Sequence, residues 1–227
     1  NAVHSKRLHD RLQEAYRDLK TLEELRDSLT HMLVHDLRSP LMAMSMSLEI
    51  VMDEIDKLSA DSREVVVMAQ NSCQSLVEMV GSLLDVSRLE AGQMPLDRTT
   101  CDLREIALAA AESMKGAARQ KNLVIGVTGT SALCSADREL TRRIFINLIA
   151  NAIKFSPADG AIGMDVSLAR GTVHCAVTDS GYGIPPEYHQ RIFEKFGQVE
   201  ARNEGKMYST GLGLTFCKLA VEAHGGR

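Results

Sequence analysis

A chain of 227 residues with a net charge of −4 has no cationic footprint for nucleic acid, and it contains no tryptophan on which single-stranded bases could stack. Its hydrophobic fraction of 44% and charged fraction of 25% are ordinary for globular protein and allow one large domain or two small ones. No apolar run reaches the roughly 18 residues of a membrane-spanning helix, and no signal-peptide pattern is present. Because the chain begins with Asn1 rather than methionine, we expect it to be a segment of a longer protein.

The five cysteines are odd in number, widely spread and never spaced as CxxC. This usage is typical of reduced thiols in a cytosolic protein and not of a disulfide framework. We therefore expect all five to be structural.

Residues 1–57 are expected to form one long helix, because apolar residues recur at helical spacing and residues 1–90 contain only one proline and one glycine. Near the N-terminus the apolar positions alternate in four- and three-residue steps, which is a heptad seam and requires a partner helix. The seam consists of Leu8, Leu12, Ala15, Leu19, Leu22, Leu29 and Leu33, with Arg26 in its one polar position.

A second helix is predicted to begin at the capping-box-like sequence Asp61–Glu64 and to end by Ala91–Gly92. Its apolar stripe consists of Val66, Ala69, Cys73, Leu76, Val80 and Leu83. Two long antiparallel helices with one apolar stripe each cannot close a core alone. We therefore expect two copies of the chain to form a four-helix bundle.

From Cys101 onward the pattern changes to helices mixed with strands, which indicates an α/β two-layer sandwich and makes the whole chain α+β. The expected helices are Leu103–Arg119, Asp137–Phe155 with an aspartate cap, and Gly213–Ala223. The expected strands are Leu123–Thr128, then Ile162–Leu168 and Val173–Thr178, the last two paired across the Arg170–Gly171 turn.

The first candidate site is the sequence HDLRSPL within the first helix. Neutral imidazole offers a nitrogen lone pair near pH 7, so His35 is a competent phosphoryl acceptor, and Asp36 could hold the proton on its other nitrogen. Ser39 lies four residues on, on the His35 face, and Pro40 promotes a kink. Two other interpretations stay open: a histidine that only decorates the surface, and a metal pair with His31, for which no further ligands follow in pattern.

The second candidate site is NLIANAIKF, where Asn147 and Asn151 lie four residues apart and Lys154 continues the same face. An amide oxygen suits Mg²⁺ carried by a triphosphate, and the lysine can neutralise phosphate charge. The competing interpretation is a pair of asparagines that satisfy a buried turn or face solvent. The neighbouring face, expected to pack on the sheet, carries Leu140, Ile144 and Leu148.

The third candidate is DSGYGIP after an apolar strand. Asp179 could accept a hydrogen bond from the exocyclic amine of adenine, while Gly181 and Gly183 allow a ligand close to the backbone. An ordinary turn explains this sequence equally well when it is taken alone.

The fourth candidate is TGLGLT, where Gly211 and Gly213 open a helix whose N–H groups could face phosphate. It is not a P-loop, and Phe216 stands where the GxGxxG fingerprint needs a third glycine. A plain turn into a helix is again the alternative. Between the third and fourth candidates, RIFEKF is expected to supply aromatic packing, and residues 197–209 are polar enough for a mobile lid.

Taken in order, HDLRSPL, NLIANAIKF, DSGYGIP, RIFEKF and TGLGL resemble the H, N, G1, F and G2 boxes of sensor histidine kinases. Each box is weak alone, but five in this order over about 180 residues form a specific signal, which covers residues 30–226. The implied fold is a dimerisation hairpin followed by the ATP-binding sandwich shared with gyrase and the heat-shock chaperone of that superfamily.

The resemblance also implies roles for single residues. His35 would be the phosphoacceptor and Asp36 its acid–base partner, and Asn151 would bind Mg²⁺. Asn147 and Lys154 would contact the phosphates. The remaining ATP contacts would come from Asp179, as adenine reader, and from Gly181, Gly183, Gly211 and Gly213.

Two departures from the family pattern matter. The position of the phosphatase role, four residues after the phosphoacceptor, is often Thr or Asn in this family but is Ser39 here, which puts phosphatase activity in doubt. The chain also stops at Arg227, where relatives continue into a further strand, so we expect a truncated sheet edge.

Two other functions are alternatives to a histidine kinase. ATP-hydrolysing machines of the superfamily carry Glu in place of Asn147, and an amide cannot activate water as a carboxylate does. A non-enzymatic signalling dimer would not need His35, Asn151 and both glycine loops together.

The expected organisation is a coiled-coil connector over residues 1–30, a phosphotransfer hairpin over 31–92, a linker over 93–100 and an ATP-binding domain over 101–227. The expected partners are a second copy of the chain, a response regulator receiver domain and an upstream sensor domain, with no nucleic acid. We expect the chain to be the cytoplasmic portion of a sensor protein whose full length is either membrane-anchored or soluble.

Overall fold

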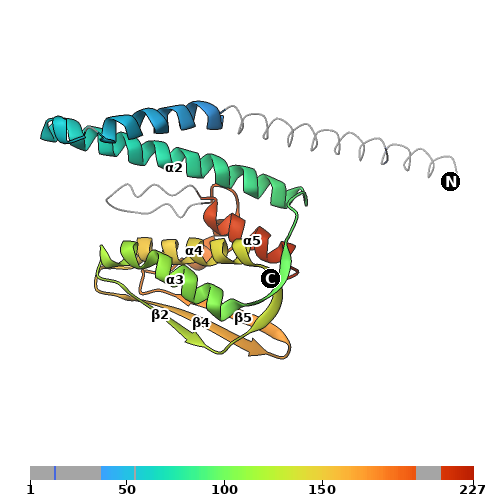
Figure 1. Cartoon of the computed structure of the whole chain (residues 1–227). Helices are drawn as coiled ribbons and strands as arrows, with labels where there is room; N and C mark the ends of the chain where they lie inside the picture. The colour runs from blue at the N-terminus through green and yellow to red at the C-terminus, as the bar shows by residue number, and fades with distance from the viewer. Residues whose placement is uncertain (1–12, 14–36, 54, 198–210) are drawn as a thin grey trace. The chain divides into compact units, whose positions relative to one another are not determined.

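The computed structural model of the chain describes residues 13, 37–53, 55–197 and 211–227 (Figure 1). It divides into two compact units, Asn1–Ala91 and Gly92–Arg227. The predicted heptad seam of the N-terminal helix lies outside the described residues. Within the described residues, no helix has both the length and the apolarity to cross a membrane.

The first unit is an antiparallel helical hairpin. Residues 37–53 are helical through Pro40, and α2 (Ala60–Glu90) runs back beside them (Figure 1). The sequence predicts an α-helix up to Lys57, but the chain instead tightens into the 3₁₀ helix η1 (Ile55–Lys57).

The hairpin turn is held by Arg63, which reaches back from the first turn of α2. Its Nη2 donates to the carbonyl of Asp56 at 2.7 Å and its Nε to the carbonyl of Leu58 at 3.1 Å. These bonds satisfy carbonyl groups that lose their helical partners where the chain reverses. The turn therefore ends the first helix before the predicted residue.

The N-cap of α2 is Ser59, and the prediction of a capping box starting at Asp61 is wrong. The Ser59 side chain accepts a hydrogen bond from the Ser62 amide at 3.3 Å. Asp61 then lies in the first turn, where its negative charge favours the positive end of the helix dipole. The end of α2 at Glu90, with Ala91 as C-cap, confirms the predicted end.

The hairpin buries only a narrow seam. Its core cluster consists of Leu41, Cys73, Val80 and Leu84, and the Cys73 thiol donates to the Leu41 carbonyl at 3.3 Å. Many other large apolar side chains of the hairpin are exposed: Leu37, Met42, Met44, Met46, Ile50, Val51, Val65, Val67, Met68 and Leu76. One copy of the hairpin therefore does not close its own core, as the single stripes predict.

The second unit begins with β1 (Arg98–Asp102), α3 (Leu103–Arg119), β2 (Val124–Gly129), β3 (Leu133–Asp137) and α4 (Arg138–Phe155). It continues with β4 (Ala161–Ala169), β5 (Thr172–Thr178), the 3₁₀ helices η2 (Pro186–Tyr188) and η3 (Arg191–Phe193), and α5 (Gly213–Ala223). The bounds of α3, α4 and α5 confirm the prediction, including the Asp137 cap.

Among the described residues, the strands form two sheets. β2 pairs with β4 in parallel, and β4 pairs with β5 in antiparallel orientation across Arg170 and Gly171, both at positive φ. β1 and β3 form a separate antiparallel pair that the sequence analysis missed, and β1 begins inside the segment expected to be a linker.

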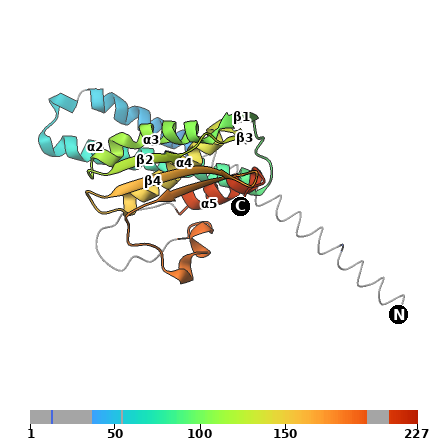
Figure 2. The ribbon, with the colours of Figure 1, turned by 90° about the horizontal axis from the view of Figure 1, so that it is seen from below.

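The core of the second unit lies between the three-stranded sheet and the helices α3 and α4, which cover one of its faces (Figure 2). Strand β4 alternates as a half-buried strand should, with Ile162, Met164 and Val166 all buried. The side of α4 in this core carries Phe145, Ile149, Ala152 and Ile153. This corrects the predicted sheet-facing side: Leu140 and Ile144 are buried outside the cluster, and Leu148 is half-buried.

A histidine joins the end of α5 to the start of α4. The Asp137 amide donates to Nε2 of His224 at 2.9 Å, so the ring proton must lie on Nδ1, which faces the Ala220 carbonyl at 2.7 Å. The Asp137 carboxylate in turn accepts from the Asp97 amide at 3.0 Å. The ring therefore acts as donor and acceptor at one junction.

All five cysteines are free thiols, as expected. Burial raises the pKa of the Cys217 thiol to about 12, so this side chain is protonated and unreactive at neutral pH.

Candidate functional site

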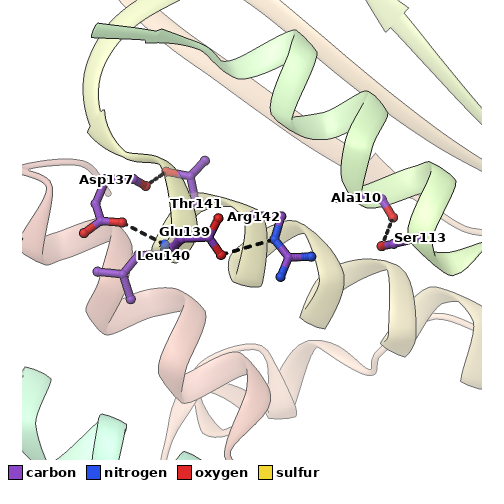
Figure 3. Close-up of polar contacts among 7 residues, drawn as sticks. All are labelled: Ala110, Ser113, Asp137, Glu139, Leu140, Thr141 and Arg142. Atoms are coloured by element: carbon purple, nitrogen blue, oxygen red, sulfur yellow. Dashed lines mark hydrogen bonds and ion pairs between the residues drawn. The ribbon is translucent and has the colours of Figure 1, made fainter. Parts of the chain in front are cut away.

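The helix α4 positions three of the predicted site residues. Its start is fixed by Asp137, whose carboxylate accepts from the Leu140 amide at 3.0 Å and whose carbonyl accepts from the Thr141 hydroxyl at 2.7 Å (Figure 3). From this anchored end, Asn147, Asn151 and Lys154 follow at four- and three-residue steps and are all half-buried. The predicted face therefore exists as a row of two amides and one ammonium.

The pKa of Lys154 is lowered from its ordinary value because burial desolvates the ammonium. A partly dehydrated cation interacts more strongly with an anion than a hydrated one does. The Lys154 ammonium also lies 5.2 Å from the ring centroid of Phe155. A cation held in this way, at the end of a row of amides, suits a phosphate group.

An aromatic pair stands at the C-terminal end of α4. The rings of Phe155 and Tyr182 meet edge to face, with centroids 5.9 Å apart and an interplanar angle of 81°. Tyr182 is 74% exposed and lies between two site glycines. Neither residue was predicted from the sequence as part of the site, although a signal is present: Phe155 directly follows Lys154, and Tyr182 lies inside DSGYGIP.

The segment after β5 packs onto this end of α4 through Gly181. A Cβ at Gly181 would lie 2.6 Å from Oδ1 of Asp179 and 2.9 Å from the Phe155 carbonyl oxygen, so only glycine fits. The Gly181 amide donates to Asp179 Oδ1 at 2.7 Å, and Gly183 has a φ of 73°. Both glycines are thus required by the backbone, and the carboxyl group of Asp179 is oriented by its own loop.

The start of α5 lies beside Asn147, at the other end of the row of site residues on α4. Gly211 has a φ of 66° and packs against Phe196, whose amide donates to the Gly211 carbonyl at 3.2 Å. A Cβ at Gly213 would lie 3.4 Å from Oδ1 of Asn147, so the first turn of α5 faces the Asn147 amide. The structure therefore brings Asn147 and Gly213 together, and separately brings Lys154, Gly181 and Asp179 to the other end of α4.

Some predicted residues are placed elsewhere or not described. Ser39 is exposed on the helix of the first unit. His35, Asp36, His31 and the predicted lid lie outside the described residues, apart from Gly197. The aromatic residues of RIFEKF were expected to supply packing, but Phe193 and Phe196 are exposed because η3 is a short surface turn.

The donor set fits a nucleotide that brings its own magnesium. Among the described residues, no cluster of three histidine, cysteine, aspartate or glutamate side chains could hold a metal alone. Amide oxygens such as those of Asn147 and Asn151 are weak, neutral Mg²⁺ ligands that complete a shell supplied mostly by phosphate and water. The glycine turn beside Asn147 leaves the room that a Cβ would fill.

Two family models match separate parts of the chain. Residues 25–92 match the His Kinase A (phospho-acceptor) domain. Residues 136–227 match the histidine kinase-, DNA gyrase B- and HSP90-like ATPase.

Individual relatives agree with these models. The hybrid signal transduction histidine kinase D of Dictyostelium discoideum is 32% identical over 97% of this chain and 15% of that protein. The adaptive-response sensory kinase SasA of Gloeothece citriformis is 32% identical over 96% of this chain and 57% of that protein. Full-length ShkA, solved in complex with AMPPNP, superposes with a TM-score of 0.73 at 28% identity, over 87% of this chain and 41% of that chain.

The chain belongs to the sensor histidine kinases and is their catalytic core, with a phospho-acceptor domain followed by an ATPase-type domain. It spans 15% of the length of the first of these curated relatives and 57% of the length of the second.

Proposed function

We propose that the protein transfers the γ-phosphoryl group of ATP to His35 and then relays it to an aspartate of a response regulator receiver domain. It is then an ATP:protein-L-histidine phosphotransferase. The observation that carries this proposal is the row of Asn147, Asn151 and Lys154 on α4, with Gly213 facing its first amide and Gly181 packed on its last turn. Family membership supports it by adding a phospho-acceptor domain.

Each site residue takes one task in this proposal. Asn151 would hold the Mg²⁺ that ATP carries, and that ion would supply neutralisation of phosphate charge. Asn147, Lys154 and the backbone of the turn with Gly211 and Gly213 would contact phosphate oxygens. The Asp179 carboxylate would accept from the adenine amine, with Gly181 and Gly183 letting the ligand approach the backbone.

The transfer step needs a nucleophile and no activated water. One imidazole nitrogen of His35 forms a bond to the γ-phosphorus while the bond from that phosphorus to the bridging oxygen breaks, and ADP leaves. Asp36 would hold the proton on the other ring nitrogen and stabilise the positive charge that develops on the ring. Asn147 cannot act as a base toward water, so transfer to His35 is favoured over hydrolysis.

The proposal includes a homodimer, because the hairpin exposes an apolar groove. A cavity of about 640 Å³ lies between its two helices and is lined by Leu41, Ala43, Met44, Ser47, Leu48, Ala69, Ser72, Cys73 and Leu76. A second hairpin would cover this groove and complete a four-helix bundle. In the full-length protein, an upstream sensor domain would control this cytoplasmic core.

Ser39 carries the remaining part of the proposal. It is exposed and lies four residues after His35 in the sequence, where its hydroxyl could position water for dephosphorylation of the receiver domain. Ser39→Ala would then lower phosphatase activity and spare autophosphorylation. Equal loss of both activities would show that Ser39 serves helix geometry only.

The experiment that tests the main proposal is incubation of the chain with Mg²⁺ and ATP labelled on the γ-phosphate. We expect label on the protein that is lost in acid and kept in base, as a phosphoramidate requires. Asn151→Ala should lower the rate by at least about tenfold, roughly 1.4 kcal/mol in the transition state. Acid-stable, base-labile label would mean a hydroxyl acceptor, and release of inorganic phosphate without any labelled protein would mean hydrolysis.

A further inference from the structure

The turn between α3 and β2 contains a lysine with an unusual set of partners. The Lys121 ammonium donates to the carbonyl oxygens of Ile153 at 2.9 Å, Lys154 at 2.8 Å and Ser156 at 3.2 Å. All three acceptors belong to the C-terminal turn of α4 and the residue that caps it. One side chain, about 30 residues earlier in the chain, therefore uses all three of its donors on a single turn.

This turn would otherwise leave backbone groups unsatisfied. The last four carbonyls of a helix have no partner within it, and in α4 the first of them, that of Ala152, accepts from the Ser156 amide at 3.0 Å. Lys121 satisfies the next two, and the fourth, that of Phe155, faces Gly181. A positive charge at this end also favours the negative end of the helix dipole.

We call the three hydrogen bonds from the Lys121 ammonium to the end of α4 the Lys121 clamp. Backbone hydrogen bonds hold the clamp itself in place. The Asp159 amide donates to the Lys121 carbonyl at 3.0 Å, and the Val124 amide donates to the Gly160 carbonyl at 3.2 Å. Lys121 is therefore bonded to the end of α4 through its ammonium and to the loop after α4 through its backbone carbonyl. The same turn contains the Ser156 hydroxyl, which is buried without a hydrogen-bond partner among the described residues.

Three groups of the site depend on where this turn lies. Lys154 is one of the residues whose carbonyl is clamped, and the next residue, Phe155, carries the ring that meets Tyr182. A Cβ at Gly181 would lie 2.9 Å from the Phe155 carbonyl oxygen, so the loop of Asp179 packs closely on the same turn. A shift of this turn would move the phosphate-side cation and the adenine-side loop together.

We propose that Lys121 is a positioning residue for the nucleotide site, which holds the end of α4 so that Lys154 and the Asp179 loop face one ligand. It touches neither the nucleotide nor the acceptor. This inference rests on the proposed function, because it assumes that ATP binds at α4. Its consequence is that ATP affinity depends on a lysine that lies outside all five sequence boxes.

The test compares Lys121→Met, which keeps the stem and removes the donors, with Lys115→Met as a matched control. Lys115 is exposed, and its ammonium forms an ion pair with Glu112 on the same helix. We expect the Kd of ATP for Lys121→Met to rise about tenfold, which corresponds to the loss of a charged hydrogen-bonding group. The kcat at saturating ATP should change less than the KM, Lys121→Arg should recover part of the affinity, and Lys115→Met should bind as the parent does.

A purely structural role predicts a different result. Lys121→Met would then lower the melting temperature, while the Kd of ATP and the increase in melting temperature caused by saturating ATP would stay as in the parent. That result would overturn the inference. If Lys121→Met does not fold, Lys121→Gln, which keeps two donors, takes its place: weaker ATP binding supports the positioning role and unchanged binding overturns it. Absence of ATP binding by the parent chain would instead contradict the proposed function, and the inference with it.

Discussion

The helical hairpin and the sandwich solve the problem of burying apolar surface in different ways. In the sandwich, Ile149 and Val166 are fully buried between helices and sheet within one chain. In the hairpin, Met44 and Leu76 both line the apolar groove and are 55% and 45% exposed. The sandwich therefore closes a core within one copy, whereas the described part of the hairpin leaves an apolar groove that a second copy can cover. Stability of the first should not depend on protein concentration, and stability of the second should.

The largest expected effect is the loss of autophosphorylation when the hairpin alone is altered. His35→Gln removes the acceptor from the hairpin and leaves the sandwich untouched. We expect autophosphorylation to be abolished while ATP binding and the oligomeric state stay as in the parent. Acid-labile label that persists in the variant would eliminate His35 as the acceptor.

The second prediction uses one isoleucine from each region. Ile149→Ala empties a fully buried position of the sandwich and should lower the free energy of unfolding by about 2 to 5 kcal/mol, independent of protein concentration. Ile50→Ala, at an exposed hairpin position, should change it by less than about 0.5 kcal/mol. Urea unfolding followed by circular dichroism measures both. Similar losses from the two variants would break the contrast between the regions.

The third prediction concerns the surface that the hairpin leaves open. Met44 lines the apolar groove, whereas Met46 is 62% exposed and does not. Met44→Glu should weaken the dimer at least about tenfold, roughly 1.4 kcal/mol, because it places a charge in an apolar interface. Met46→Glu is the matched control and should leave the dimer intact in sedimentation equilibrium. Equal weakening by both would show that the groove is not the interface.

The smallest effect is expected at the N-cap of α2. Ser59→Ala removes the acceptor of the Ser62 amide and should cost about 1 kcal/mol of hairpin stability. Ser75→Ala is the control, since the Ser75 hydroxyl only donates back to the Asn71 carbonyl within the helix and alanine is a better helix former. Thermal unfolding of the hairpin should therefore move in opposite directions in the two variants. A loss of the same size in both would assign the effect to something other than the cap.

Local signals explain why the helices of the sandwich could be predicted. The bounds of α3 and α4 depend on aspartate caps and amphipathic spacing, and the opening of α5 depends on its glycines, all of which act over a few residues. The strand pair β1 and β3 could not be found in this way. Each has five residues, β1 buries only Cys101, and their pairing joins segments about 30 residues apart.

Tertiary contacts decide the rest of the site. The spacing of Asn147, Asn151 and Lys154 was enough to place them on one face, because a helix repeats in a fixed way. Which apolar side of α4 meets the sheet could not be read, since the helix is apolar on more than one side and buries both Ile144 and Ile149. The Lys121 clamp could not be predicted from the sequence either, because its acceptors are backbone carbonyls, which every residue has.

The junction of His224 has a chemical consequence for what can replace it. The position must donate to the Ala220 carbonyl and accept from the Asp137 amide at the same time. Lysine and arginine can only donate, leucine can do neither, and a glutamine or asparagine amide can do both. If all residues are tested at position 224 and scored for folded protein, the tolerated ones should therefore be those that can donate and accept a hydrogen bond at the same time. Size, charge and hydrophobicity should matter less.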